Sequence, residues 1–84
     1  MDTKTKELIA IGASVTANCV PCLKYHFAKA RKAGTSDDEI REAIDVGRMV
    51  RKGAAGKWDE EAITIFSAAS DSKTETTEET CGNI

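Results

Sequence analysis

Two thiols and an imidazole lie close together in the segment CVPCLKYH, residues 19–26. Cys19, Cys22 and His26 are spaced three and four residues apart, and side chains with that spacing share one face of a helix. A cysteine reacts as the thiolate, which a helix N-terminus and a neighbouring imidazole both favour. Because two residues separate the cysteines, a sulfur that has reacted with an oxidant can be attacked by the other. The segment therefore predicts thiol–disulfide chemistry.

A carboxylate upstream of the pair is suited to orient the histidine. An imidazole that accepts a proton is usually held by such a group, and Glu7 stands 12 residues before Cys19 in a stretch with helical periodicity. If that helix and the next form an antiparallel hairpin, Glu7 and His26 lie at the same end of it, and helix tilt has to bring them together. We therefore predict the catalytic residues Glu7, Cys19, Cys22 and His26.

The elements that must position these residues have a helical pattern nearly throughout. No stretch shows sustained alternation of β-branched and polar residues, so strands are not expected. The pattern predicts a first helix over about residues 4–18 and a second over about residues 19–33. Pro21 suits the first turn of the second helix, where its missing N–H costs no hydrogen bond. Gly34 suits the position after that helix, where a positive φ is favoured.

Further helical segments are predicted after Gly34. Ser36–Glu39 has the pattern of a capping box, which begins a third helix, and the small residue Gly47 would let another backbone approach closely. The helical signal weakens at residues 53–56, where we expect a bend or a break, and a fourth segment is predicted over about residues 58–69. The positions expected to face inward on these four segments are Leu8, Ile11, Gly12 and Val15; Leu23, Phe27 and Ala30; Ile40, Ala43, Ile44, Gly47 and Val50; and Ala62, Ile65, Phe66 and Ala69.

Size and charge limit the classes of function. The chain has 84 residues, so one small domain with a thin core is expected, and such chains often gain stability from partner subunits. Its formal net charge of −2 offers no broad attraction to nucleic acid, and no apolar run approaches the roughly 20 residues that cross a bilayer. The N-terminus lacks the apolar segment of a signal peptide. We expect a cytoplasmic, self-associating protein that binds neither nucleic acid nor membrane, with Tyr25 and Trp58 in packing or interface roles.

The composition changes after Ser70. Residues 71–79 hold four acidic side chains, one lysine and no apolar side chain, which is typical of a segment that stays disordered. We therefore predict a helical domain at residues 1–70 and an acidic, disordered tail at residues 71–84. Cys81, in that tail, is expected to be an exposed free thiol, because a flexible segment fixes no geometry around it.

The offsets of Glu7, Cys19, Cys22 and His26 resemble the core motif of AhpD-like alkylhydroperoxidases, which belong to the carboxymuconolactone decarboxylase superfamily. The similarity extends through the next helix start to residues 43–55. It implies an all-α fold based on a small helical hairpin, which assembles into homotrimers or homohexamers. It also implies peroxidase activity of the peroxiredoxin type.

The resemblance further implies a role for each residue. Cys22 would be the thiolate nearest the base, and Cys19 the more accessible partner that exchanges with the electron donor. His26 would be the base, and Glu7 would complete the proton relay. Members with two repeats are twice as long, so the resemblance implies a substrate pocket built largely with neighbouring subunits. Cys81 is not part of the motif.

We therefore expect a thiol-dependent peroxidase or disulfide reductase that needs no cofactor or metal. It would act on a peroxide or a protein disulfide and take electrons from an external dithiol or a thiol protein. A lactone decarboxylase, which would not need the cysteine pair, stays open as an alternative. So does a metal-binding or redox-sensing module that holds zinc, and a structural protein whose cysteines are small buried hydrophobes. The zinc ligands would be Cys19, Cys22, His26 and either Glu7 or Cys81.

Overall fold

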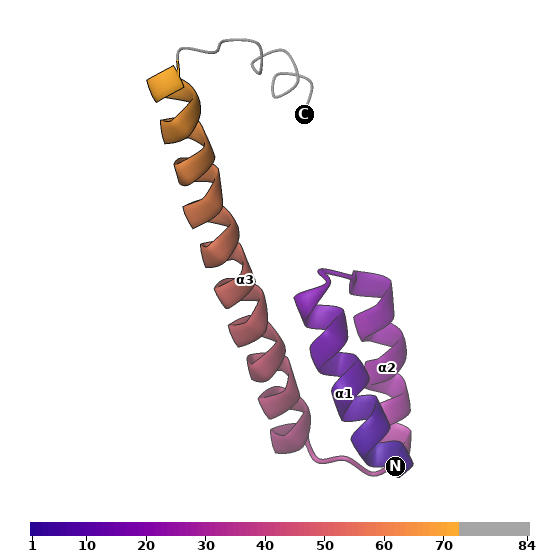
Figure 1. Ribbon diagram of the computed structural model, residues 1–84. Coiled ribbons are helices and arrows are strands. Elements are labelled where there is room, and N and C mark those ends of the chain that lie inside the picture. The colour runs from indigo at the N-terminus through magenta and orange to yellow at the C-terminus, as the bar shows by residue number, and fades with distance from the viewer. Residues whose placement is uncertain (73–84) are drawn as a thin grey trace. The chain divides into compact units, whose positions relative to one another are not determined.

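The computed structural model describes residues 1–72, with side chains for residues 1–70, and this part of the chain consists of three helices (Figure 1). They are α1 (Thr3–Thr16), α2 (Val20–Lys32) and α3 (Asp37–Ser72). No strand occurs in this part, so the all-α prediction is confirmed. No helix within it is both long and apolar enough to cross a membrane. The predictions for residues 73–84, Cys81 included, fall outside the described residues.

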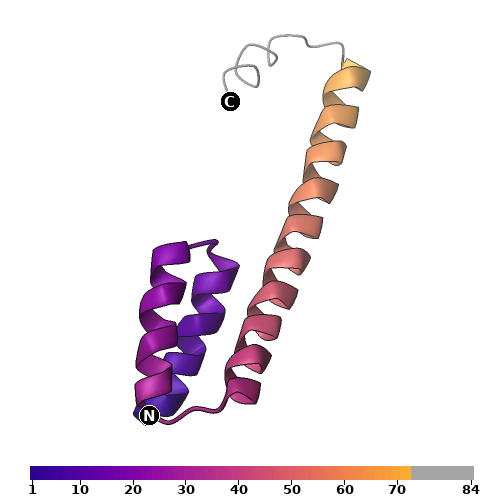
Figure 2. The same ribbon diagram turned by 180° about the vertical axis from the view of Figure 1, so that it is seen from behind.

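The chain divides into two compact units, residues 1–54 and residues 55–84. In the first unit α1 and α2 lie side by side and run in opposite directions, as both views show (Figures 1 and 2). Three residues, 17–19, connect the two helices, and a connection this short makes consecutive helices antiparallel neighbours. The hairpin that the sequence analysis required is therefore present.

The chain between α2 and α3 forms two local motifs that the sequence predicted. Gly34 adopts a φ of +90°, and the N–H of Thr35 donates to the carbonyl of Ala30 at 3.2 Å, as in a Schellman motif. At the start of α3, the N–H of Ser36 donates to Oε1 of Glu39 at 2.8 Å, and the N–H of Glu39 donates to Oγ of Ser36 at 3.1 Å. This reciprocal pair is the predicted capping box.

The core of the first unit is small and apolar. Its fully covered members are Ile11, Ala30 and Ile40, one from each helix. The partly buried apolar side chains packed against them are Leu8, Leu23, Phe27, Ala43 and Ile44. The inward faces predicted for the first three segments are thus largely confirmed. The prediction was wrong for Val50, which is half exposed and lines a surface pocket together with Val46 and Thr16.

α1 and the first part of α3 approach each other at two glycines. A Cβ added to Gly47 would lie 2.5 Å from the carbonyl oxygen of Gly12, so no larger residue fits without moving one backbone. Oγ1 of Thr16 donates to the carbonyl of Gly47 at 3.0 Å across the same contact. The close backbone approach predicted at Gly47 is confirmed.

The predicted break at residues 53–56 is absent, because α3 continues through it from Asp37 to Ser72. A glycine costs a helix about 1 kcal/mol relative to alanine, which weakens the helix without ending it. Neither Gly53 nor Gly56 adopts a positive φ, and a Cβ at either would meet open space. Nothing in the backbone therefore requires glycine at these positions.

The side chains of the second unit are more exposed than predicted. Ile65 is 65% exposed and Phe66 is 71% exposed, while Ala62 and Ala69 are partly covered. The prediction that all four face a core was wrong for the two large residues. The described part of this unit is a single helical segment, so the unit offers no second element of its own to bury that face.

Candidate redox site

A disulfide joins Cys19 and Cys22 at the start of α2, with their Cα atoms 5.3 Å apart. Cys19 is the N-cap residue of the helix, and its Sγ accepts the N–H of Cys22 at 3.3 Å. Pro21 occupies the first turn, as predicted. The sulfurs thus lie where unpaired N–H groups of the helix favour negative charge on a thiol.

The two cysteines differ in their exposure as whole residues. Cys22 is exposed, whereas Cys19 is partly buried. Cys19 lies in the turn between the helices, where its N–H donates to the carbonyl of Ser14 at 3.0 Å and its carbonyl accepts the N–H of Leu23 at 3.0 Å. As a whole residue, Cys22 is thus the more exposed member of the pair.

Glu7 and His26 meet across the hairpin, with Oε1 of Glu7 2.7 Å from Nδ1 of His26. The Glu7 side chain is 9% exposed and the His26 side chain 29%. A carboxylate can only accept, so Nδ1 carries the hydrogen and Nε2 is the nitrogen left to take up or release a proton. Packing of α1 against α2 thus brings together the two residues that helix tilt had to join.

His26 makes no hydrogen bond with either sulfur in this oxidised form, judged over the side chains that the structure describes. A disulfide has no proton to give to an imidazole, so proton transfer between Cys22 and His26 would require the reduced form. The His26 ring stands edge-on to the ring of Tyr25, with centroids 5.0 Å apart and an interplanar angle of 82°. The start of α2 therefore holds the cysteine pair, and the following turn holds the histidine and its aromatic neighbour.

Arg51 supports the turn that presents Cys19, and the sequence analysis missed it. Its Nη1 donates to the carbonyl of Val15 at 3.1 Å and to Oδ1 of Asn18 at 3.0 Å. Asn18 has a φ of +58°, a left-handed conformation that this contact helps to hold. The two hydrogen bonds join residues more than thirty positions apart in the sequence. The one sequence feature that could have indicated them is the spacing of Arg51, four residues after Gly47 and so on the face of α3 that α1 approaches.

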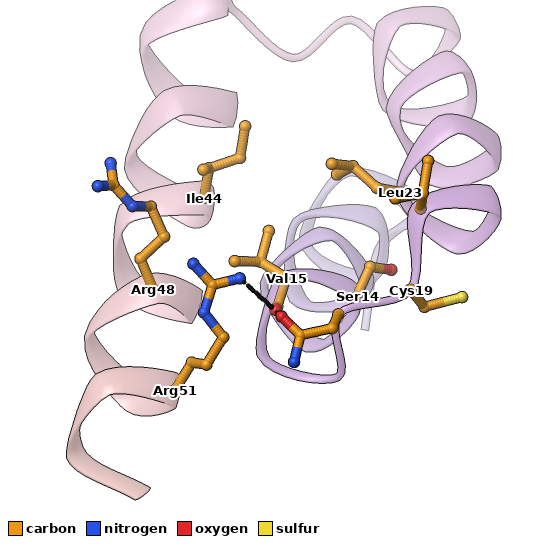
Figure 3. A pocket seen from close by; sticks show the side chains of 9 residues that line it. Ser14, Val15, Cys19, Leu23, Ile44, Arg48 and Arg51 are labelled. Atoms are coloured by element: carbon orange, nitrogen blue, oxygen red, sulfur yellow. Dashed lines mark hydrogen bonds between the residues drawn. The ribbon is translucent and has the colours of Figure 1, made fainter. Parts of the chain in front are cut away.

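A pocket of about 340 Å³ lies beside that turn (Figure 3). Figure 3 shows Arg51 reaching across it to the end of α1, while the sulfur of Cys19 points away from the guanidinium. The full lining is Ser14, Val15, Asn18, Cys19, Val20, Leu23, Ile44, Arg48 and Arg51. The pocket thus borders the backbone of the redox turn and does not open onto its sulfur.

The zinc alternative requires a form of the site in which the disulfide is reduced. No group of three or more His, Cys, Asp or Glu side chains is arranged to hold a metal ion among the residues described. In the disulfide both sulfurs are bonded to each other, and a zinc site needs them as thiolates.

Comparison with known proteins places these residues in a family. A protein of Paracoccus denitrificans named "Uncharacterized protein 4 in cox locus" is 34% identical over 66 residues, which cover 79% of this chain and 60% of that protein. The chain therefore spans less than two thirds of the length of this relative. No solved structure matches the chain. The family model described as the carboxymuconolactone decarboxylase family matches residues 1–70, and the chain belongs to that family.

Proposed function

We propose that the chain is a thiol-dependent peroxidase, of the peroxiredoxin type, or a disulfide reductase. The observation that carries this proposal is the pairing of a nearly buried Glu7 with His26, one turn beyond a disulfide at a helix N-terminus. Such a pair suits proton transfer to and from a thiol. Membership of the carboxymuconolactone decarboxylase family, whose superfamily includes the AhpD-like enzymes, supports the same proposal.

In the proposed cycle the reduced enzyme meets a peroxide. His26, oriented by Glu7, takes the proton of the Cys22 thiol. The thiolate attacks one peroxide oxygen, so that an S–O bond forms, the O–O bond breaks and the departing oxygen leaves as an alcohol with the proton from His26. Cys19 then attacks the sulfenic acid of Cys22, which forms the disulfide and releases water. An external dithiol returns two electrons and restores both thiols.

Peroxide consumption with dithiothreitol as donor tests the cycle. Cys22→Ser should abolish turnover, and His26→Ala should lower it by about 10²–10⁴-fold, the usual size of a general acid–base contribution. Lys52→Ala, an exposed change on α3, serves as the control and should leave turnover intact. Full turnover in Cys22→Ser would reject the proposal.

The pH dependence of alkylation tests the role of His26 separately. In the reduced protein the reaction of Cys22 with iodoacetamide should shift to higher pH in His26→Ala, because the thiolate loses its cationic neighbour. Glu7→Gln should shift it in the same direction and less. An unchanged profile in both variants would remove the pair from thiol activation.

The family name favours a second candidate, decarboxylation of a lactone. This reaction gives the cysteine pair no role, so it should survive Cys22→Ser. An ultraviolet assay with carboxymuconolactone, run on both proteins, separates the candidates.

We also propose that the active form is a homotrimer or homohexamer in the cytoplasm, where a reducing environment regenerates the thiols. The exposed apolar side chains Trp58, Ile65 and Phe66 support self-association. Sedimentation equilibrium measures the mass of the assembly, and a monomer at all concentrations would reject this part.

A further inference from the structure

Helix α2 has a charge unlike that of the rest of the chain. Its thirteen residues include Lys24, Lys29, Arg31 and Lys32 and no acidic residue, although the whole chain has a formal net charge of −2. All four cations are exposed. Three of them lie in the last turn, where the helix dipole favours a cation. Lys24 lies two residues after Cys22, where the dipole gives no such benefit.

Most of this positive charge is not neutralised within the chain. Arg31 pairs with Asp37 at 2.9 Å. Among the described residues no carboxylate lies within ion-pair distance of Lys24, Lys29 or Lys32. On α3, by contrast, three of the cations have an acidic partner three residues away, namely Arg41, Arg48 and Lys57.

The exposed residue Cys22 shares a face of α2 with an aromatic ring and one of these cations. Cys22, Tyr25, His26 and Lys29 follow the spacing of residues on one helix face, and we call this set the α2 redox face. Tyr25 is 59% exposed, and Nζ of Lys29 lies 5.3 Å from the centroid of its ring. A partner that reaches the sulfur of Cys22 therefore meets an exposed aromatic surface and a positive field.

We propose that the α2 redox face docks an acidic dithiol polypeptide, which is the electron donor of the cycle. This inference rests on the proposed function, which requires a donor, and it specifies the chemistry of that donor. The carboxylates of the donor complement Lys29 and Lys32, which is three residues after Lys29, and Tyr25 provides apolar contact of the kind that anchors interfaces. A donor thiolate is itself an anion, so the same field favours its approach to the disulfide.

We assign the order of the exchange from the positions of the two cysteines, because Cys22 is an exposed residue and Cys19 is the N-cap of α2. The donor thiolate attacks Sγ of Cys22, so that a mixed disulfide forms and the Cys19–Cys22 bond breaks. Cys19 leaves as a thiolate at the N-cap, where the N–H of Cys22 already bonds its sulfur and stabilises the leaving group. The second donor thiol attacks the donor sulfur of the mixed disulfide and releases Cys22. The donor dithiol becomes a disulfide, and its two electrons and two protons pass to the cysteine pair.

Two synthetic dithiol peptides provide the test. Both contain a CxxC segment of the same sequence, flanked by glutamates in one and by lysines in the other, and neutral dithiothreitol is the reference. Without peroxide present, free thiols in the full chain are followed by quenched alkylation and mass spectrometry. At low ionic strength the acidic peptide should reduce the disulfide at least about tenfold faster than the basic peptide, within the range known for electrostatic steering. The difference should shrink with added salt.

Variants locate the effect on the protein. The double variant Lys29→Glu, Lys32→Glu should abolish or reverse the preference, while dithiothreitol still reduces the disulfide. The double variant Lys52→Glu, Lys57→Glu on α3 changes the net charge by the same amount and should retain the preference. Tyr25→Ala should slow the acidic peptide and leave dithiothreitol unaffected.

Several outcomes would overturn the proposal. These are equal rates for the two peptides, failure of both to reduce the disulfide, and an equal loss of preference in the α3 control. If acidic glutathione exceeds cationic cysteamine by as much as the acidic peptide exceeds the basic one, the donor is a small acidic thiol and the polypeptide part is wrong. Failure of the proposed function would be seen in a different experiment, as an absence of peroxide turnover with dithiothreitol. The rates of disulfide reduction by the two peptides are measured without peroxide and do not depend on that turnover.

Discussion

Helices α2 and α3 both begin with a side chain that accepts a backbone N–H three residues later, but the two side chains differ in chemistry. At α3 the acceptor is the hydroxyl of Ser36, and Glu39 returns a second hydrogen bond. At α2 the acceptor is the sulfur of Cys19, a weak acceptor with no reciprocal partner. The α3 start is built for stability. The α2 start uses the N-cap position for a reactive atom and gains its covalent support from the disulfide.

The comparison has a consequence for reduction. Breaking the Cys19–Cys22 bond removes a covalent constraint at the start of α2 and leaves a thiol or thiolate as its cap. The start of α3 has no redox group and should not respond. The following changes separate the two helix starts, beginning with the change that should have the largest effect.

Replacing Cys19 by serine should remove all disulfide formation at α2. The serine hydroxyl is a stronger N-cap acceptor than a thiol, so the variant should be as stable as the reduced wild-type protein, or more stable by about 0.5 kcal/mol. Mass spectrometry after treatment with diamide checks the first result, and thermal unfolding under reducing conditions checks the second. A variant much less stable than the reduced wild type would mean that the sulfur packs as a core side chain and that its capping role is minor.

Replacing Arg51 by methionine should weaken the turn before α2 and leave the start of α3 intact. The change removes hydrogen bonds from a charged donor to the Val15 carbonyl and to Asn18, and a loss of about 2 kcal/mol in unfolding free energy is expected. Reduced Cys19 should also alkylate faster, because the turn no longer holds it partly covered. Arg48→Met, an exposed change on the same helix, is the control, and equal effects in the two variants would contradict a specific role for Arg51.

Replacing Ser36 by alanine should affect the start of α3 alone. Loss of an N-cap hydroxyl typically costs about 1 kcal/mol, which chemical denaturation can measure. The rate at which dithiothreitol reduces the Cys19–Cys22 disulfide should stay the same. A changed rate would show that the two helix starts are coupled.

Acidification should weaken the capping box at the start of α3, and this is the smallest of the expected effects. The hydrogen bond from the Ser36 backbone lowers the pKa of Glu39 below its ordinary value of 4.5. A lowered folded-state pKa means that this contact stabilises the folded protein above the ordinary value and is lost as the pH falls through the lowered one. The amide signal of Ser36 in an NMR titration should therefore move with a midpoint below 4.5. In Glu39→Gln that movement should disappear, and a midpoint at or above the ordinary value would contradict the capping box in solution.

The sequence predicted best what is decided locally. The capping box at Ser36–Glu39 and the positive φ at Gly34 depend on residues within one turn, so their patterns can be read directly. The juxtaposition of Glu7 and His26 needed the hairpin as well, and the sequence supplied it through the short connection between two periodic segments.

The features that the sequence could not predict depend on contacts between residues far apart in the chain, or on which other residues cover a given helix face. The bonds of Arg51 to the end of α1 join residues that no local pattern links. The continuation of α3 through residues 53–56 depends on whether the helix propensity of the neighbouring residues outweighs that of the two glycines. Glycine is less favourable than alanine in a helix by about 1 kcal/mol for each residue. The exposure of Phe66 could not follow from its spacing, since periodicity identifies an apolar face and not what covers it.

Trp58, the one tryptophan of the chain, is 72% exposed in the second unit. An indole in water emits fluorescence at a longer wavelength than an indole covered by protein. The intrinsic fluorescence of the unlabelled chain is thus an optical reporter for whatever comes to cover residues 55–70. It can be followed in real time at each concentration and salt condition, without chemical labels or substituted residues.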